Sequence, residues 1–499
     1  MTILATTNAS QVSTLPGGWL LVPLEQLIAP VAHAITDGPF GSNLKSAHYT
    51  DTGPRVIRLQ NIGDGVFKDE EAHIAPERYE LLRKHAVSPG NIAMALLGEV
   101  LPRACIVPDW LGLAIVKADC VKIVLDESIV DSRFVCTALN SQQVRSRTSK
   151  LIKGIGRPRL NLRQARQITV PIAPRPEQVR IADRIDELFT DLSAGVAALE
   201  RVRRKLKRYR SAVLHAAVTG KLHTSTTPTW ASESNWRSLG EIISEIEQGW
   251  SPKCDREPAT NSEQWAVMTT TAIQPMAFDG GENKKLPATL NPYADLELRV
   301  GDILITRAGP RKRAGIACLV RKTRQRLILC DKAYRFRCKA DQATGEFIEM
   351  VLNARPITDS IERMKTGSSD SGLNLTQSRF RSLTVPIPPI DEQNEIVELV
   401  QEKLSQIDAM EAEVERGLAR ASRLRQAILK SSFSGKLVPQ DPSDDPAAML
   451  LDRIKAVRAQ QHAASNGREK RTTIKKAVRK RAPAKASRAA KASAKRKQK

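Results

Sequence analysis

The sequence predicts two similar α/β (α+β) domains, each followed by a long helix, in a chain that repeats itself once. Three observations support this fold class. Two segments 215 residues apart are nearly the same, "VPIAPRPEQVRIADRIDEL" from Val170 and "VPIPPIDEQNEIVELVQEKL" from Val385. After each segment, apolar residues recur every three or four positions, which is typical of a helix. Before each segment, short apolar runs with β-branched residues lie between Gly, Pro and Asp, which predicts strands.

The duplication extends well beyond these two segments. The match runs without a gap from Val170 to Leu222 and from Val385 to Leu437, and both copies end in Gly-Lys-Leu. Upstream it is weaker: "RLNLRQARQITVPI" resembles "GLNLTQSRFRSLTVPI", and each half opens with a Trp, in "WLLVPLEQLI" and "WRSLGEII". Solenoid repeats are 20 to 50 residues long. The sequence therefore predicts duplication of a whole domain together with its helix.

Each helix has recognisable ends. A proline suits the first helical turn, and Glu177 and Asp391 place a carboxylate near the positive end of the helix dipole. Gly220 and Gly435 are natural stops. From Pro176 to Leu214 the first helix would be about 58 Å long, at a rise of 1.5 Å per residue.

The periodic apolar residues predict coiled-coil seams on both helices. Two such helices would most simply pack against each other, although each could instead pack against a helix of a partner protein. The seam and partner-docking residues expected from the spacing are Leu188, Leu192, Leu199, Val202, Leu206, Leu404, Ile407, Val414, Leu424 and Ile428.

The two globular blocks contain the predicted strands. In the first block these are "RVIRLQNI", "NIAMALLG", "RACIVP" and "CVKIVL". In the second block they are "WAVMTTTAI", "DILITRAG", "IACLV" and "RLILCDKAYRFRCK". Turn residues flank these runs, so we expect short strands within mixed α/β domains.

Charge points to a polyanionic partner. The net charge is +24; residues 468–499 carry +14 of it, so the remainder still carries +10. A basic core with a basic tail favours nucleic acid. The Lys/Ala/Arg-rich segment 466–499 lacks apolar periodicity, so we expect a disordered tail that binds DNA without sequence preference, or alternatively one that only aids solubility.

Other features of the composition favour a cytoplasmic, DNA-associated protein. No run of eighteen apolar residues and no secretory-type amino terminus is present, so we expect no membrane association. The seven cysteines are scattered without metal-ligand spacing. We therefore expect reduced thiols and no metal site.

A search for catalytic motifs favours a non-catalytic chain. The Gly220-Lys221 and Gly435-Lys436 pairs close helices and lack the P-loop hydroxyl residue, and "GIGRPR" lacks a dinucleotide fingerprint. The "NPY" from Asn291 is one proline short of an adenine-methyltransferase tetrad. The "ENK" from Glu282 could belong to a nuclease, but it lacks the usual upstream acid.

Recognition of DNA remains the favoured chemistry. Arginine and lysine contact phosphate and guanine, and Asn or Gln contacts adenine. The candidates lie in "DGPFGSNLKSAHYTDTGPRVIRLQNIGDG", in the Gly-rich loop before the first helix and in "TRAGPRKRAG". Any one of them could equally be a solvated surface charge. These DNA-binding candidates are Lys45, Arg55, Arg58, Gln60, Asn61, Lys153, Arg157, Arg159, Arg307, Arg311, Lys312 and Arg313.

These motifs together resemble the specificity subunit of type I restriction-modification enzymes. The resemblance covers residues 19 to 460 and rests on "DGPFGSNLKSAHYT", the paired "VPIAPRPEQ" and "VPIPPIDEQ" helix starts, the paired "GKL" ends and "GKLVPQDPSDDPAAMLLDRI". It implies two target-recognition domains, each reading half of a split DNA site. It also implies two helical regions forming an antiparallel coiled coil that sets the spacer, with pseudo-twofold symmetry.

The resemblance also implies a domain order and partners. The chain would bind no cofactor; two methyltransferase (modification) subunits would carry S-adenosylmethionine, and restriction subunits, if present, would use ATP and Mg²⁺. The expected parts are a flexible N-terminus (1–18), recognition domain 1 (19–170), helical region 1 (171–222), recognition domain 2 (223–384), helical region 2 (385–440), a helical extension (441–465) and the tail (466–499).

A rival hypothesis from a different class is a structural DNA-bridging protein. It would use two basic heads, a coiled coil and the basic tail, and it would bind DNA without sequence preference. A second rival, an autonomous DNA-modifying enzyme, is disfavoured by the missing methyltransferase tetrad.

Overall fold

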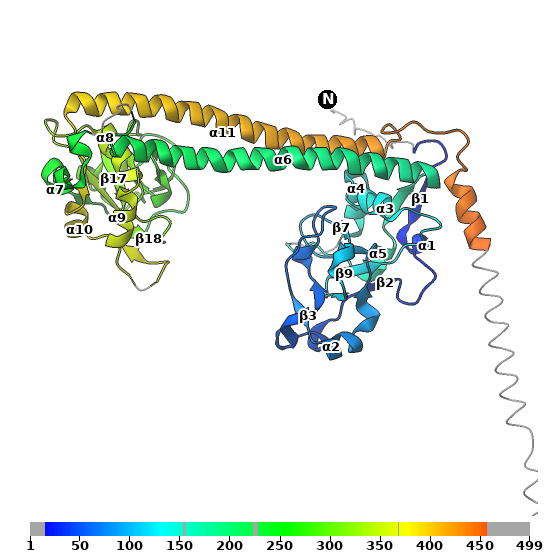
Figure 1. Ribbon diagram of the computed structural model, residues 1–499. Coiled ribbons are helices and arrows are strands. Elements are labelled where there is room, and N and C mark those ends of the chain that lie inside the picture. The colour runs from blue at the N-terminus through cyan, green and yellow to red at the C-terminus, as the bar shows by residue number, and fades with distance from the viewer. Residues whose placement is uncertain (1–14, 153–155, 223–227, 368, 457–499) are drawn as a thin grey trace, which may run out of the picture. The chain divides into compact units, whose positions relative to one another are not determined.

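The computed structural model describes residues 15–152, 156–222, 228–367 and 369–456, which divide into two compact units (Figure 1). The first unit contains the described residues up to Gly195 and from Ala419 onward, and the second runs from Val196 to Leu418. Two long helices, α6 (Arg175–Val218) and α11 (Ile390–Ser432), contribute one part to each unit. Residues 1–14 of the predicted flexible N-terminus, residues 457–465 of the predicted extension and the whole predicted tail (466–499) lie outside the described residues.

The globular part of the first unit is built around a four-stranded antiparallel sheet. Its order is β2-β9-β6-β7, with bounds Ile35–Asp37, Cys120–Ile123, Ile92–Ala95 and Arg103–Ile106. Every residue of β6 is buried. Because both faces of this strand are covered, its sequence is a continuous apolar run rather than an alternating one.

A second sheet and several short helices complete the first unit. The sheet order is β4-β3-β8-β5, with bounds His73–Ile74, Tyr49–Ile57, Ala114–Val116 and Ala86–Val87, and β3 runs parallel to β8. Strand β1 (Leu20–Pro23) pairs with β10 (Thr169–Ile172), directly before α6. The short helices are α1 (Leu24–Leu27), α2 (Pro76–Leu81), α3 (Ser132–Leu139), α4 (Gln142–Thr148) and α5 (Leu162–Arg166).

The second unit has a central sheet of the same topology. Its order is β12-β21-β17-β19, with bounds Glu247–Gln248, Ala333–Phe336, Ile303–Thr306 and Ala317–Leu319. Numbered along the chain within each unit, both central sheets place the first strand beside the fourth, then the second and the third. The mixed α/β content that the sequence predicts is confirmed, and each predicted run contains a strand.

The remaining elements of the second unit surround this sheet. A second sheet has the order β16-β13-β20, with bounds Asn283–Lys285, Ala266–Met268 and Leu327–Ile328. The strand pairs are β11 (Arg237–Ser238) with β23 (Thr384–Val385), β14 (Ile273–Gln274) with β15 (Ala277–Phe278), and β18 (Ala308–Gly309) with β22 (Leu373–Asn374). The helices are α7 (Leu239–Ile242), α8 (Gly345–Asn353), α9 (Ile357–Met364) and α10 (Gln377–Arg381).

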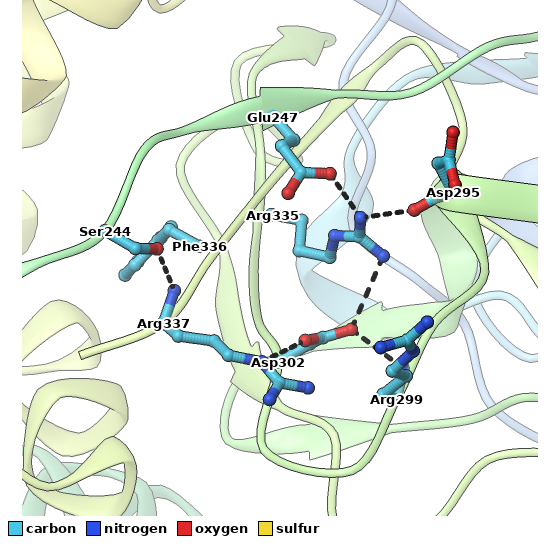
Figure 2. Close-up of a pocket in the computed structure, with 8 residues that line it drawn as sticks. All are labelled: Ser244, Glu247, Asp295, Arg299, Asp302, Arg335, Phe336 and Arg337. Carbon is cyan, nitrogen blue, oxygen red and sulfur yellow. Dashed lines mark hydrogen bonds and ion pairs between the residues drawn. The ribbon is translucent and has the colours of Figure 1, made fainter. Parts of the chain in front are cut away.

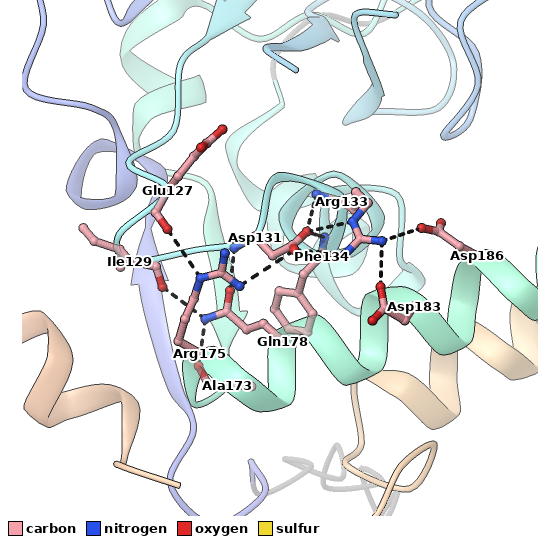
Figure 3. Close-up of polar contacts among 10 residues, drawn as sticks. All are labelled: Glu127, Ile129, Asp131, Arg133, Phe134, Ala173, Arg175, Gln178, Asp183 and Asp186. Carbon is pink, nitrogen blue, oxygen red and sulfur yellow. Dashed lines mark hydrogen bonds and ion pairs between the residues drawn. The ribbon is translucent and has the colours of Figure 1, made fainter. Parts of the chain in front are cut away.

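A buried glutamine fastens α6 to the globular part of the first unit (Figure 3). Gln178 is fully buried. Its Oε1 accepts a hydrogen bond from the backbone N–H of Asp131 at 2.9 Å, and its Nε2 donates to the carbonyls of Ala173 at 2.8 Å and Ile129 at 3.3 Å. Asp131 is the N-cap of α3, since its carboxylate accepts from two backbone N–H groups of that helix. One amide therefore joins the start of α6 to the start of α3.

The second unit repeats this clamp. Gln393, 215 residues after Gln178, is also fully buried. Its Oε1 accepts from the backbone N–H of Thr344 at 2.9 Å, and its Nε2 donates to the carbonyls of Pro388 at 2.9 Å and Gln342 at 3.1 Å. Thr344 is the N-cap of α8. Each long helix thus begins at an amide clamp of the same design.

The glutamate before each glutamine holds a tryptophan. The indole Nε1 of Trp19 donates to Glu177 at 3.0 Å, and the Nε1 of Trp230 donates to Glu392 at 2.8 Å. Trp236 has the position in the second unit that Trp19 has in the first, directly before the strand that pairs with β23, as the sequence predicts; the hydrogen bond to Glu392, however, comes from Trp230. Trp236 directly precedes β11, and its Nε1 has no hydrogen-bond partner among the described residues.

The long helices end at the predicted glycines. Helix α6 continues four residues past the predicted Leu214, and Gly220 follows with φ of +67°. Lys221 N–H donates to the carbonyl of Ala216 and Gly220 N–H to that of Ala217, which is the Schellman pattern. Gly435, with φ of +68°, ends α11 in the same way.

In the second unit the two helices pack with opposite directions. Leu206, Val213, Leu404, Ile407 and Val414 belong to one buried cluster. Residue numbers fall along α11 as they rise along α6: Arg203 pairs with Glu415 at 3.1 Å, and Arg210 pairs with Glu411 at 3.1 Å. In the first unit, Ile181 and Ile185 of α6 share a cluster with Ile428, Leu429 and Phe433.

Two predicted seam residues face outward. Val202 is 42% exposed and Leu424 is 49% exposed, so their assignment to the seam is wrong. Neighbouring arginines take the inward positions: Arg203 faces Glu415, and Arg425 stacks 4.0 Å from the ring centre of Phe189. Among the other predicted seam residues, Leu206, Leu404, Ile407, Val414 and Ile428 are buried, whereas Leu188, Leu192 and Leu199 are half-buried.

The segment after α11 returns to the start of α6 in the first unit. Gln440 Nε2 donates to the carbonyl of Gly17 at 3.1 Å, and Arg180 pairs with Asp444 at 2.6 Å. A helix occupies 447–456, within the predicted extension. None of the helices in the described ranges combines the length and apolar character that a bilayer span requires.

Glu177 predicts a pH dependence of stability. Burial raises the pKa of its carboxyl group, against the hydrogen bonds from Trp19 and Gln440 and the charge of Arg180, all of which lower it. The folded protein therefore retains a proton that the unfolded chain has released, and stability falls as the pH rises through the raised pKa, above the ordinary value of 4.5. Glu177→Gln should abolish this fall, because an amide still accepts from Trp19 but cannot ionise.

Urea unfolding of both proteins between pH 4.5 and 8 tests this expectation. Glu177→Ala is the matched control; it cannot ionise either, but it leaves the Trp19 N–H without its acceptor and should be about 1–3 kcal/mol less stable than Glu177→Gln at every pH. A difference between wild type and Glu177→Gln that stays constant with pH would contradict the assignment.

Candidate nucleic-acid interface

Loops of the first unit gather at one end of its central sheet. Gly38, directly after β2, lies so close to Lys117 that a Cβ atom would be 2.1 Å from the Lys117 carbonyl carbon. Arg159 pairs with Asp119 at 2.6 Å and lies over the exposed Phe40 ring, 5.7 Å from its centre. Three segments that are distant in sequence therefore form one half-exposed surface with a cation and an aromatic ring.

Other predicted DNA-binding residues of this unit lie in exposed loops. The Lys45 side chain is exposed, and its backbone N–H donates to His48 Nδ1 at 3.0 Å. Arg157 is exposed and makes no ion pair within the described ranges. Lys153 lies outside the described residues.

The predicted cluster from Arg55 to Asn61 is mostly a structural network. Asn61 is 1% exposed; its Oδ1 accepts from the Arg58 N–H at 2.8 Å, and its Nδ2 donates to the carbonyls of Lys68 and Glu70 at 2.9 and 2.8 Å. Asn61 therefore cannot reach a base in this conformation, and its assignment as a DNA contact is wrong. Its amide instead shapes the turn between residues 58 and 70.

The other members of this cluster are bound by an acidic segment, residues 69–71. Arg55 pairs with Asp69 at 2.6 Å and keeps 13% of its side chain exposed. Arg58 donates to the Glu71 carbonyl at 3.0 Å, and Gln60 donates to the Glu70 carboxylate at 2.9 Å. These donors are already satisfied, so they would have to exchange partners before they could contact DNA.

In the second unit, the four predicted cations on the loop after β17 divide into two kinds. Arg307 donates to the Asp331 carbonyl at 2.8 Å and to Asn374 Oδ1 at 2.7 Å, and Arg313 donates to the Ile273 carbonyl at 2.8 Å. Both hold neighbouring segments in place. Arg311 is half exposed and pairs with Glu362 and with Asp370 at 2.8 Å. Lys312 is exposed and forms no ion pair with any described residue.

A pocket of about 480 Å³ adjoins this loop. The Thr270 and Asp331 backbones, which Arg313 and Arg307 contact, lie on its lining. Three exposed lysines also line it, namely Lys253, Lys284 and Lys332. The sequence does not single out these lysines, because each stands alone in its own segment and only the fold brings the three segments together.

A second polar pocket, of about 320 Å³, lies at the opposite ends of strands β17 and β21 (Figure 2). Two of its three arginines, Arg335 and Arg337, are paired with carboxylates, whereas Arg299 is exposed. Asp302 accepts from Arg337 at 2.8 Å, and Arg335 pairs with Glu247 and lies 3.7 Å from Asp302. Because these arginines are satisfied by carboxylates, the network stabilises the sheet edge and offers little attraction to an anion.

The acidic residues and thiols considered as catalytic or metal groups have ordinary structural roles. Glu282 accepts from Thr271 Oγ1 at 2.5 Å, and Asp279 accepts from the Gly281 N–H at 2.9 Å. Burial raises the pKa of the Cys330 thiol to about 11. Within the described part of the chain, no group of three or more His, Cys, Asp or Glu residues could hold a metal ion.

Comparison with known proteins finds relatives of one family. A family model described as "Type I restriction modification DNA specificity domain" matches residues 302–418. The specificity subunit of the type I restriction enzyme EcoKI from Escherichia coli K12 is 27% identical over 469 residues, which cover 89% of this chain and 96% of that protein. Over most of its length the chain is therefore similar to the specificity subunits of type I restriction-modification enzymes.

Two further matches agree with this similarity. The EcoEI specificity subunit from Escherichia coli is 34% identical over 199 residues, which cover 40% of this chain but only 34% of that protein. A solved structure from a study of complex assembly and conformational transition of the type I R-M system has the same fold, with a TM-score of 0.60 and 17% identity, covering 85% of this chain and 99% of that one. These matches support the predicted resemblance to specificity subunits.

Asn61 and its neighbour Gln60 give a direct test of the corrected assignment. Asn61→Ala removes three hydrogen bonds from a buried turn, so it should destabilise the protein by about 2–3 kcal/mol. Gln60→Ala removes one exposed hydrogen bond and should change stability by less than about 0.5 kcal/mol. Thermal unfolding measures both. Equal stability of the two variants would restore Asn61 as a candidate reader of bases.

Proposed function

We propose that each unit reads one half of a bipartite DNA site, while α6 and α11 set the spacer as an antiparallel coiled coil and dock modification subunits. The observation that carries this proposal is the repeated clamp, in which Gln178 and Gln393 fasten corresponding helices of two similar domains to the starts of the long helices. A split DNA site needs two similar readers held in fixed relation to their own helices.

The chemistry of the loops supports a DNA ligand. Exposed cations lie at the end of the central sheet in each unit, including Arg157 and Arg159 in the first and Lys312 in the second. Phosphate contacts from such residues set the register of a protein on DNA, and a few base contacts then provide specificity. The net charge of +24 adds attraction for DNA at long range.

Exposed apolar side chains on the helices support docking of a partner. In the second unit, Val202 and Tyr209 of α6 are 42% and 51% exposed; in the first unit, Leu424 of α11 is 49% exposed. Large apolar groups on a helix surface are common at protein interfaces. In this proposal the chain itself binds no cofactor, and the partner subunits carry S-adenosylmethionine, ATP and Mg²⁺.

Methylome sequencing tests the whole proposal. Cells with the chain and its modification subunit should carry adenine methylation at one split motif, and the motif should vanish when the chain is deleted. The chain should also co-purify with the modification subunit. An unchanged methylome, with the chain expressed, would contradict the proposal. Sequence-independent binding would then favour the DNA-bridging hypothesis.

A substitution of Lys312 tests whether each unit reads only one half-site. Lys312→Ala should weaken binding about three- to tenfold, because one charge–phosphate or charge–base contact is lost, and it should do so through one half-site only. Competition with DNA in which one or the other half-site is scrambled measures this. Lys45→Ala is the matched variant in the first unit. If the binding of both variants depended equally on both half-sites, the assignment of one half-site to each unit would be contradicted.

A further inference from the structure

The lysine pocket of the second unit is assembled from three separate segments. Lys253 lies in the loop after β12, Lys284 lies on β16, and Lys332 directly precedes β21. The Ser251 hydroxyl accepts from the Asp331 N–H at 3.1 Å, which ties the first segment to the third. Val267 of β13 is directly opposite Lys284 in the strand pairing, which ties in the second. The pocket is therefore a fixed feature of the fold.

These lysines are available to a ligand. All three are exposed, and none forms an ion pair with any residue that the structure describes. Their neighbours behave differently: Lys285 lies 3.9 Å from Asp255, and the nearby Arg307 and Arg313 are engaged with backbone carbonyls. Three unpaired ammonium groups around one concavity repel one another, and an electronegative ligand would relieve this repulsion.

The walls suit the edge of a base pair. Buried Val267 and Met268 form an apolar part of the lining, and the hydroxyl residues Ser251, Thr269 and Thr270 add polar groups. A binding site of this kind combines apolar walls with a few polar groups that fix orientation. Asp331 carries the one carboxylate on the described lining.

The donor and acceptor pattern selects among base pairs. Lysine ammonium groups donate to N7 and O6 of guanine, and an aspartate carboxylate accepts from N4 of cytosine. We propose that this pocket reads a G·C base pair in the half-site of the second unit, with its lysines on guanine and Asp331 on cytosine. The arginines of the adjoining loop support the pocket instead of reading bases. This inference rests on the proposed function and adds the identity of the groups that read DNA.

The arginine-lined pocket at the opposite ends of β17 and β21 is a useful comparison, because its paired cations are not free to bind a ligand. Figure 2 shows Arg335 and Arg337 directed at Glu247, Asp302 and the Asp295 carbonyl. That pocket contains three arginines, and Arg335 and Arg337 use their hydrogen bonds within the protein. The lysine pocket differs because its cations have no ion-pair partners among the described residues, and it lies at the end of the sheet that also carries Lys312.

Guanine N7 provides the test. The complex of this chain with its modification subunits is titrated with duplexes of the methylome-defined target, each carrying 7-deazaguanine at one guanine of the second half-site. One such substitution should weaken binding about tenfold or more for the wild type. The same substitution should have less than a twofold effect when the chain carries Lys284→Ala, because the contact is already lost. Lys285→Ala, which changes the neighbouring lysine paired with Asp255, should retain the full tenfold sensitivity.

The outcomes separate the inference from the proposed function. Specific binding that is insensitive to 7-deazaguanine at every position of the second half-site would overturn the pocket assignment and leave the proposed function intact. A Lys284→Ala complex with a shallower salt dependence but unchanged 7-deazaguanine sensitivity would mean that Lys284 contacts only phosphate, and would also overturn it. Absence of any half-site preference in the wild type would instead refute the proposed function.

Discussion

The buried amide clamp at the start of each long helix is the interaction on which the rest of the structure depends. Gln178 and Gln393 each use their oxygen on the backbone N–H of an N-cap residue and their nitrogen on two carbonyls. Both amides are fully buried and their partners are buried or partly buried, so the loss of either amide would cost free energy. An amide also has a defined direction, since one side donates and the other accepts. It therefore sets how each globular domain is held against its helix, which apolar packing alone would leave adjustable.

Polar residues specify how α6 and α11 pair in the second unit. Arg203 and Arg210 occupy inward positions of α6 in the second unit, where they meet carboxylates of α11. Such pairs contribute little to stability when partly exposed, but only one register places each arginine beside its acid. The apolar residues Val202 and Tyr209 consequently turn outward. The same arrangement therefore fixes the register and leaves apolar groups on the surface.

The two units share a scaffold and differ in their surfaces. In the first unit, Asp69, Glu70 and Glu71 engage Arg55, Arg58 and Gln60. In the second unit, three lysines surround a pocket without ion-pair partners among the described residues. The central sheets nevertheless have the same strand order. A loop at the end of a strand can change its side chains without disturbing the core, so two copies of one fold can carry different surfaces.

The amino-acid sequence by itself determined the duplication signal, the mixed α/β content, the long helices with their glycine stops, and the resemblance to specificity subunits. These features depend on local patterns: periodicity of apolar residues, turn residues, and motifs repeated at a constant offset. Tertiary structure decided which Trp donates to which Glu and that Asn61 is buried. It also decided that arginines replace Val202 and Leu424 in the helix packing and that three lone lysines form one pocket. The physical reason is that a side chain's role depends on which partners the fold places within hydrogen-bonding distance. A polar residue has the same letter in the sequence whether it faces a buried carbonyl, a carboxylate or solvent.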